Sequence, residues 1–352
     1  MKRIGLIVII LLFVSLYFVI DYDSNNSSSE LIKPVIDETG IRTFKMELVL
    51  LKPFNFPDGK SVFRIFSDGA NVWGIDNNQE VILIENYGNK VNLGLVKSGG
   101  APFENSQLSS VRNFNGNLHM VDIEKNTIRS QIGLDSIVDF RKLLTPIYNG
   151  VPVKDDRYLT ITDEGPQSSL QLISVSDAVP IWSKELMDLF ELESTDFPEI
   201  VAEGVFTYNQ KQTFYVPGRI GAFATFSEDG SLNYIAKTID KTQAPKVFTK
   251  QILKGFTAQM FVREPDFYVN YSASADDRLI YILSKFKLGR NDDFMTVDTY
   301  EVHNGGYFTS FAVPNLGEEL PIEIAVLDNN LFFVLYENYS VAVFEIHLKT
   351  EY

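Results

Sequence analysis

The sequence predicts an all-β fold, a six-bladed β-propeller with four-stranded antiparallel blades, preceded by an N-terminal signal or membrane-spanning helix. A phrase of apolar strand, turn and apolar strand begins at Asn71 and returns 46 residues later at Asn117. Strand-built repeats of about 40–50 residues are typical of propeller blades. The chain also holds 27 Phe and 16 Tyr, whose rings suit the packed faces of sheets. Helical periodicity is nearly absent, which completes the all-β prediction.

Residues 1–20 have the pattern of an export segment. Lys2 and Arg3 precede the uncharged run Ile4–Ile20, and acidic Asp21 and Asp23 follow it. A basic flank, an apolar helix and an acidic flank direct the following chain out of the cytoplasm. The run lacks a small-residue cleavage site at its end, which favours an uncleaved membrane anchor over a cleaved signal peptide.

This pattern divides the chain into an anchor or signal peptide at 1–20, a flexible polar spacer at 21–42 and a propeller at 43–352. The chain has no cysteine, so a lipid-anchored form is excluded. We expect the propeller to lie outside the cytoplasm in the cell envelope, membrane-anchored rather than secreted. Membrane contact is expected through the N-terminal helix only.

The strand phrase occurs six times, once for each expected blade. In each occurrence, turn-forming residues separate two strand-like runs. The first strands of these pairs are expected at Asn71–Asp76, Asn117–Asp122, Arg157–Asp163, Gln212–Val216, Arg278–Leu283 and Asn330–Leu335. A short helix is expected only at Ser183–Leu192.

Closure of the ring is expected to join the two ends of the chain. A propeller avoids a long exposed strand edge when its first and last strands share a blade. The early strand Met46–Leu51 is therefore expected to complete the blade that ends at Val341–Ile346.

A resemblance supports the fold prediction. The phrase Ser98–Glu104, followed by Leu108–Val111 and Asn117–Asp122, resembles a motif of bacterial six-bladed propellers of the TolB-like and NHL-like kind. Ala275–Leu283 looks like a later blade of the same exported group. The chain departs from the motif at Ala101, where the motif has glycine. The resemblance implies the propeller fold; proteins of this architecture include scaffolds, lyases, and lactonases that hold calcium in the central channel.

Composition limits the function. A net charge of −15 repels phosphate backbones, so no nucleic-acid partner is expected. The histidines His119, His303 and His347 show no metal-ligand spacing. Nucleotide-binding glycine phrases and a serine nucleophile elbow are also missing from the sequence.

Carboxylates are the abundant reactive groups. Asp76, Asp122 and Asp163 recur at strand ends, where aspartate caps the following turn. The paired aspartates of two loops are the candidate calcium ligands, since oxygen ligands from several blades could converge in a channel: Asp276, Asp277, Asp292 and Asp293. Solvated loop charges are the competing interpretation of these four residues, and no other cofactor is expected.

An acidic insertion is the candidate docking segment. Glu185–Glu203 holds seven acidic residues and no basic one, and long insertions in compact folds are often functional. Its proposed partner-binding residues are Glu191, Glu193, Asp196 and Glu199. A solvated excursion of the chain is the alternative.

The leading functional hypothesis is a non-catalytic exported propeller that binds a protein, peptide or glycan at one face. One alternative is a calcium-dependent hydrolase or lyase with its site in the central channel. Another is a structural subunit of a cell-envelope assembly. Fold analogy alone cannot choose among them.

Overall fold

The computed structural model describes most of the chain from Arg42 onward. All described residues belong to one compact unit, Thr39–Tyr352. The described ranges are 42–54, 61–85, 90–92, 107–114, 117–132, 136–143, 145–154, 156–163, 168–174, 176, 179–192, 201, 203–240, 247–253, 256–261, 268–287, 294–328 and 330–349. The expected export segment and spacer, residues 1–41, lie outside them. Among these residues no helix reaches the length and apolar character needed to cross a membrane.

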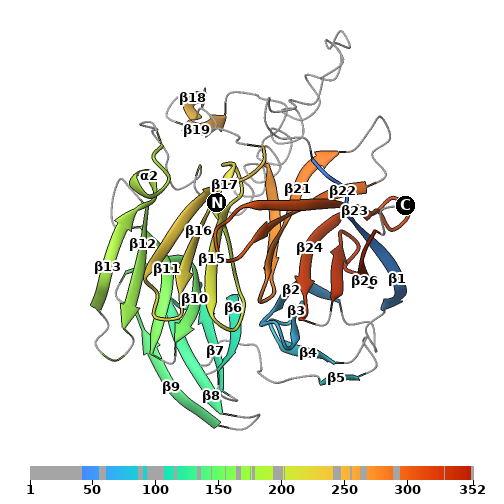
Figure 1. The fold of residues 1–352 in the computed structure, drawn as a ribbon. Helices are drawn as coiled ribbons and strands as arrows, with labels where there is room; N and C mark the ends of the chain where they lie inside the picture. Colours follow the sequence, from blue (N-terminus) through green and yellow to red (C-terminus); the bar gives the residue numbers. More distant parts are fainter. Residues whose placement is uncertain are drawn as a thin grey trace, which may run out of the picture. The chain divides into compact units, whose positions relative to one another are not determined.

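The described strands form six four-stranded antiparallel sheets, which are the blades of a propeller (Figure 1). Blades 1 to 5 are β2–β5, β6–β9, β10–β13, β14–β17 and β20–β23, and blade 6 is β24–β26 with β1. The first strand of each blade is its inner strand: β2 (Val62–Ser67), β6 (Leu108–Phe114), β10 (Ile147–Lys154), β14 (Gly204–Tyr208), β20 (Asn270–Ala275) and β24 (Pro321–Val326).

Each of the six strand phrases of the sequence belongs to a different blade, as predicted, and the structure shows that it forms the second and third strands of that blade. The second strands are β3 (Val72–Asp76), β7 (Asn117–Asp122), β11 (Arg157–Asp163), β15 (Gln212–Pro217), β21 (Leu279–Lys287) and β25 (Leu331–Tyr336). The third strands are β4 (Val81–Glu85), β8 (Thr127–Ile132), β12 (Ser168–Ser174), β16 (Ala222–Ser227), β22 (Phe294–Glu301) and β26 (Val341–Leu348).

The outer strands include the predicted closure. They are β5 (Lys90–Asn92), β9 (Ser136–Lys142), β13 (Val179–Glu185), β17 (Leu232–Lys237), β23 (Tyr307–Pro314) and β1 (Met46–Phe54). Strand β1 pairs antiparallel with β26, from Met46 opposite Leu348 to Phe54 opposite Val341. The joint blade is therefore confirmed.

Six apolar clusters hold the ring together, one between each pair of consecutive blades. Two of them show the pattern: Leu159 and Leu172 of blade 3 pack with Phe226 of blade 4, and Val297 of blade 5 packs with Phe332 of blade 6. Each blade therefore buries both faces against its neighbours, and no blade has an independent core. The cluster between blades 6 and 1 closes the circle.

Blade 4 lies between the two longest connections that join one blade to the next. The connection before it, residues 186–203, starts with helix α2 (Leu186–Leu189). The helix is shorter than predicted because β13 extends to Glu185. The connection after it, residues 238–269, carries the separate pair β18 (Val247–Leu253) and β19 (Phe256–Phe261).

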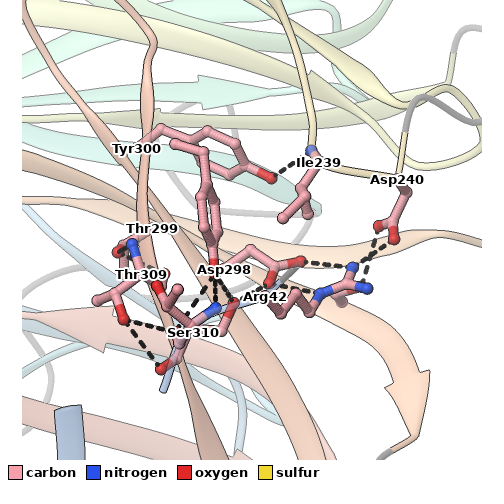
Figure 2. Close-up of polar contacts among 11 residues, drawn as sticks. Arg42, Ile239, Asp240, Asp298, Thr299, Tyr300, Thr309 and Ser310 are labelled. Atoms are coloured by element: carbon pink, nitrogen blue, oxygen red, sulfur yellow. Dashed lines mark hydrogen bonds and ion pairs between the residues drawn. The ribbon is translucent and has the colours of Figure 1, made fainter. Parts of the chain in front are cut away.

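The segment before β1 crosses the outer strand of blade 5. The carbonyl oxygen of Thr43 accepts hydrogen bonds from the Ser310 amide and the Thr309 hydroxyl. The Arg42 guanidinium reaches between blades 4 and 5, where it contacts Asp298 of β22 and Asp240, which follows β17 (Figure 2). The segment before β1 thus joins blade 6, to which β1 belongs, to blade 5 and to the connection that follows blade 4.

Candidate functional site

A β-bulge recurs near the start of the inner strands. Five of the six inner strands carry an extra residue at their second position, where the register with the second strand shifts. The extra residues are Phe63, Ser109, Tyr148, Tyr271 and Ile322. A bulge changes the direction in which the neighbouring side chains point. Strand β14 of blade 4 pairs without a register shift.

The residue after each bulge is polar and contacts the backbone of the next blade's inner strand. Arg64 donates to the Ser109 carbonyl oxygen at 3.0 Å. The Ser110 hydroxyl donates to the Gly150 carbonyl oxygen at 2.6 Å. Asn149 donates to the Gly204 carbonyl oxygen at 3.0 Å. The Ser272 hydroxyl accepts from the Ile324 amide at 3.1 Å. These contacts tie consecutive inner strands around the channel.

Glu323 completes the series between blades 6 and 1. Its carboxylate accepts from the Ile65 amide at 2.6 Å and from Arg64 at 3.2 Å. Burial raises the pKa of Glu323, although Arg64 opposes the shift. At the junction of blades 4 and 5 the residue at the corresponding register is Val205, which pairs with Val216 and packs against the apolar cluster between these two blades.

The irregular blade 4 therefore marks the place where the repeats differ. Its inner strand begins with Gly204, where a β-carbon would lie 2.4 Å from the Val216 carbonyl oxygen. Only glycine allows β14 to approach β15 this closely. The bulged residues of the two flanking inner strands are both tyrosines with exposed rings, Tyr148 at 52% and Tyr271 at 36%.

Arg219 lies in the turn between β15 and β16, at the same end of the blades as the bulges of the flanking inner strands. Its guanidinium stacks over the Tyr268 ring at 4.1 Å, contacts the Tyr268 hydroxyl, and donates to Glu203 at 2.8 Å. Gly218 permits this arrangement, since a β-carbon there would meet the Tyr268 ring at 3.0 Å. Burial raises the pKa of Tyr268, while Arg219 opposes the shift.

We call this group the blade-four mouth, defined by Tyr148, Glu203, Arg219, Tyr268 and Tyr271. Backbone hydrogen bonds link the segments that carry Glu203, Arg219 and Tyr271. The Gly218 amide donates to the Glu203 carbonyl oxygen at 2.7 Å, and the Asn270 amide donates to the Gly218 carbonyl oxygen at 3.1 Å. The Tyr268 and Tyr271 rings lie 6.0 Å apart. The mouth thus combines amphipathic rings, a fixed cation and an exposed carboxylate, which are groups suited to recognition.

The predicted calcium ligands that the structure describes lie at the other end of the inner strands. Asp276 accepts hydrogen bonds from the Arg278 and Leu279 amides and from the Tyr281 hydroxyl, each at 2.7 Å. Asp277 forms an ion pair with Lys211 at 3.2 Å. Asp292 and Asp293 lie outside the described residues. No group of three or more histidine or acidic side chains in the described ranges could hold a metal ion.

Turn capping explains the aspartates of the strand phrase. Asp76 accepts from the Asn78 and Glu80 amides, each at 2.9 Å. Asp122 accepts from the Lys125 amide at 3.1 Å. Capping is confirmed for these two residues, while the Asp163 side chain lies outside the described part.

The acidic insertion meets the mouth at its last residue, Glu203. Of the predicted partner-binding residues, Glu191 is exposed and follows helix α2. Glu193, Asp196 and Glu199 lie outside the described residues. Sequence reasoning did not single out Tyr148, Tyr271 or Arg219, because tyrosine in a strand pattern is typical of packing.

A buried arginine on the inner strand β6 joins blades 2, 3 and 4. Arg112 donates to the carbonyl oxygens of Pro152 at 2.9 Å and Asn209 at 2.6 Å. Its guanidinium lies 4.4 Å from the ring centres of Phe114 and Tyr208. Burial lowers the pKa of Arg112 to about 10. Arg112 is enclosed by protein and acts in packing.

Comparison with known proteins bears out the propeller fold. No protein-family model and no curated protein matches the chain. A member of the DUF4221 family from Bacteroides vulgatus is similar at 10% identity and a TM-score of 0.52, over 88% of this chain and 100% of that one.

Two further solved structures are similar at this level. A protein from Bacteroides fragilis that is described as exported has 10% identity and a TM-score of 0.50, over 87% of this chain and 96% of that one. A virginiamycin B lyase from Staphylococcus aureus has 11% identity and a TM-score of 0.48, over 85% and 99%. At 10% identity, the likeness to the two Bacteroides structures shows the fold alone: this chain is a six-bladed β-propeller.

Proposed function

We propose that the protein is an exported, non-catalytic propeller that binds a protein, peptide or glycan through the blade-four mouth. One observation carries this proposal: the blade that breaks the repeat lies between two inner strands that each bulge at an exposed tyrosine, and its β15–β16 turn holds a fixed arginine. Exposed tyrosines combine a large apolar surface with a polar hydroxyl, and are common at recognition surfaces.

The flanking connections support the same location. Residues 186–203 and 238–269 both adjoin blade 4 at the end where the inner strands begin. Long connections on a rigid scaffold commonly carry function.

Export is the second part of the proposal. The basic flank, apolar run and acidic flank of residues 1–23 support it, and the similar protein from Bacteroides fragilis is described as exported. We infer a membrane anchor at 1–20 and a place among the TolB-like and NHL-like exported propellers. The resemblance of Ser98–Glu104 and Asn117–Asp122 to the motif of those propellers supports that finer placement.

A library experiment tests the binding proposal. The full-length protein in detergent micelles is screened against peptide and glycan libraries, and each hit is measured again with Tyr148→Ala and Tyr271→Ala. We expect about tenfold weaker binding for each variant, because loss of one aromatic contact costs about 1–2 kcal/mol.

Tyr339→Ala is the matched control, since Tyr339 is similarly exposed at 45% but lies in blade 6. Its binding should equal that of the unmodified protein. Hits that bind all four proteins equally, or the absence of hits from both libraries, would contradict the proposal. Turnover of a bound hit would contradict its non-catalytic part.

A further inference from the structure

We propose that Arg219 recognises a carboxylate group of a peptide ligand, and that Glu203 occupies this site in the free protein. The inference rests on the proposed binding function and assigns its ligand chemistry. It follows from a difference between the two partners of one ion pair. The Arg219 side chain is 4% exposed, whereas the Glu203 side chain is 62% exposed.

Arg219 is held in place without Glu203. The Tyr268 ring supports its guanidinium at 4.1 Å, and the Tyr268 hydroxyl accepts a hydrogen bond from Nη2. Tyr268 is itself fixed by its neighbours, because its ring packs against Gly218. A cation fixed in advance loses little side-chain freedom when a ligand binds.

Glu203 is exchangeable by comparison. Its carboxylate is joined to Arg219 Nη1 by a bond of 2.8 Å, and an ion pair with one solvated partner is weak. Rotation of the Glu203 side chain into water would expose Nη1 without moving the backbone. A ligand carboxylate would then form the same charge-assisted hydrogen bond in a partly dry environment, where such bonds are strong.

Charge favours a peptide over an acidic polysaccharide. The chain carries a net charge of −15, which repels a polymer with many carboxylates. A peptide can instead bring one carboxylate and otherwise neutral groups. Tyr148 and Tyr271 offer exposed rings for those neutral groups, and each occupies a bulge in an inner strand beside blade 4.

Removal of the internal carboxylate tests the inference. Binding is measured by calorimetry for the full-length protein and for Glu203→Ala. The probes are acetylated tetra-alanine with a free carboxylate, the same peptide as its amide, an acetylated and amidated Ala-Glu-Ala-Ala peptide, and glucuronate. The second and third probes separate terminal from side-chain carboxylates, and the fourth represents the sugar source.

We expect Glu203→Ala to bind at least one peptide carboxylate about fivefold more tightly than the unmodified protein. The reason is that the ion pair between Glu203 and Arg219, which the ligand must break, weakens binding by up to about this factor. The amide of tetra-alanine should not gain. Glu345→Ala is the matched control, because Glu345 is also an exposed carboxylate in an ion pair, with His347 on β26. It removes the same charge and should leave affinity unchanged.

Arg219→Lys in the Glu203→Ala background should abolish the gain, because lysine keeps the charge but loses the planar, stacked donor group. Equal affinity of Glu203→Ala and the unmodified protein, or an equal gain with Glu345→Ala, overturns the inference. Binding of glucuronate alone overturns its peptide part. If library hits still depend on Tyr148 and Tyr271 in that case, the proposed function stands and only the carboxylate inference fails.

Discussion

Arg42 and Asp298 lie 256 positions apart in the chain and are joined by two hydrogen bonds, of 2.9 and 3.0 Å. The Arg42 and Asp298 side chains are 10% and 2% exposed. Asp240 completes the arrangement, since it also accepts from Arg42 (Figure 2). The pair joins the segment before β1 to the junction of blades 4 and 5, where the apolar Val205 stands at the register that carries a polar tie in the other blades.

Arg42→Ala should lower the free energy of unfolding by about 3 kcal/mol, because it leaves two enclosed carboxylates without their cation. Urea unfolding followed by circular dichroism measures the change. Lys211→Ala is the control, since Lys211 pairs with Asp277 at an exposed site and should cost below about 1 kcal/mol. Equal effects of the two variants would show that Arg42 contributes as an ordinary surface charge.

The blades could be predicted from sequence because each is encoded locally. The alternation of apolar residues around a turn, as in Asn117–Ile132, specifies two paired strands within one short window. Closure was also predictable, because an unpaired first strand at Met46 would leave an exposed edge.

The candidate site could not be predicted in the same way. It depends on the absence of one bulge from β14, and a bulge is a property of strand register rather than of composition. Tyr148 and Tyr271 are each exposed at the bulged position of their own inner strands, β10 and β20. Arg219 meets Glu203 at the open end of the β14–β15 hairpin, 16 positions away in the chain, so neither residue carries a local motif.

Trp73 tests the packing between blades 1 and 2. Its ring is buried in the cluster with Leu108 and Met120, and its indole N–H donates to Asp68 at 3.0 Å. Trp73→Ala should cost about 3–5 kcal/mol, since it leaves a cavity and removes a buried donor. Trp73→Phe fills most of the space and should cost less. A thermal unfolding curve unchanged in Trp73→Ala would contradict this placement.

Glu323 gives a pH-dependent prediction. Burial raises its folded-state pKa above the ordinary value of 4.5, so the folded protein holds the Glu323 proton to a higher pH than the unfolded chain does. By linkage, this group's contribution to stability is greatest at acidic pH and decreases as pH rises from about 4.5 through the folded pKa.

Glu323→Gln removes the titration while keeping an oxygen that can accept from the Ile65 amide. The difference in free energy of unfolding between this variant and the unmodified protein should therefore shift in favour of the variant as pH rises through that window. Urea unfolding at several pH values from about 4 to 8 measures the difference, in which other titrating groups cancel. Two curves that stay parallel across this range would mean that Glu323 keeps an ordinary pKa and that Arg64 compensates fully for its burial.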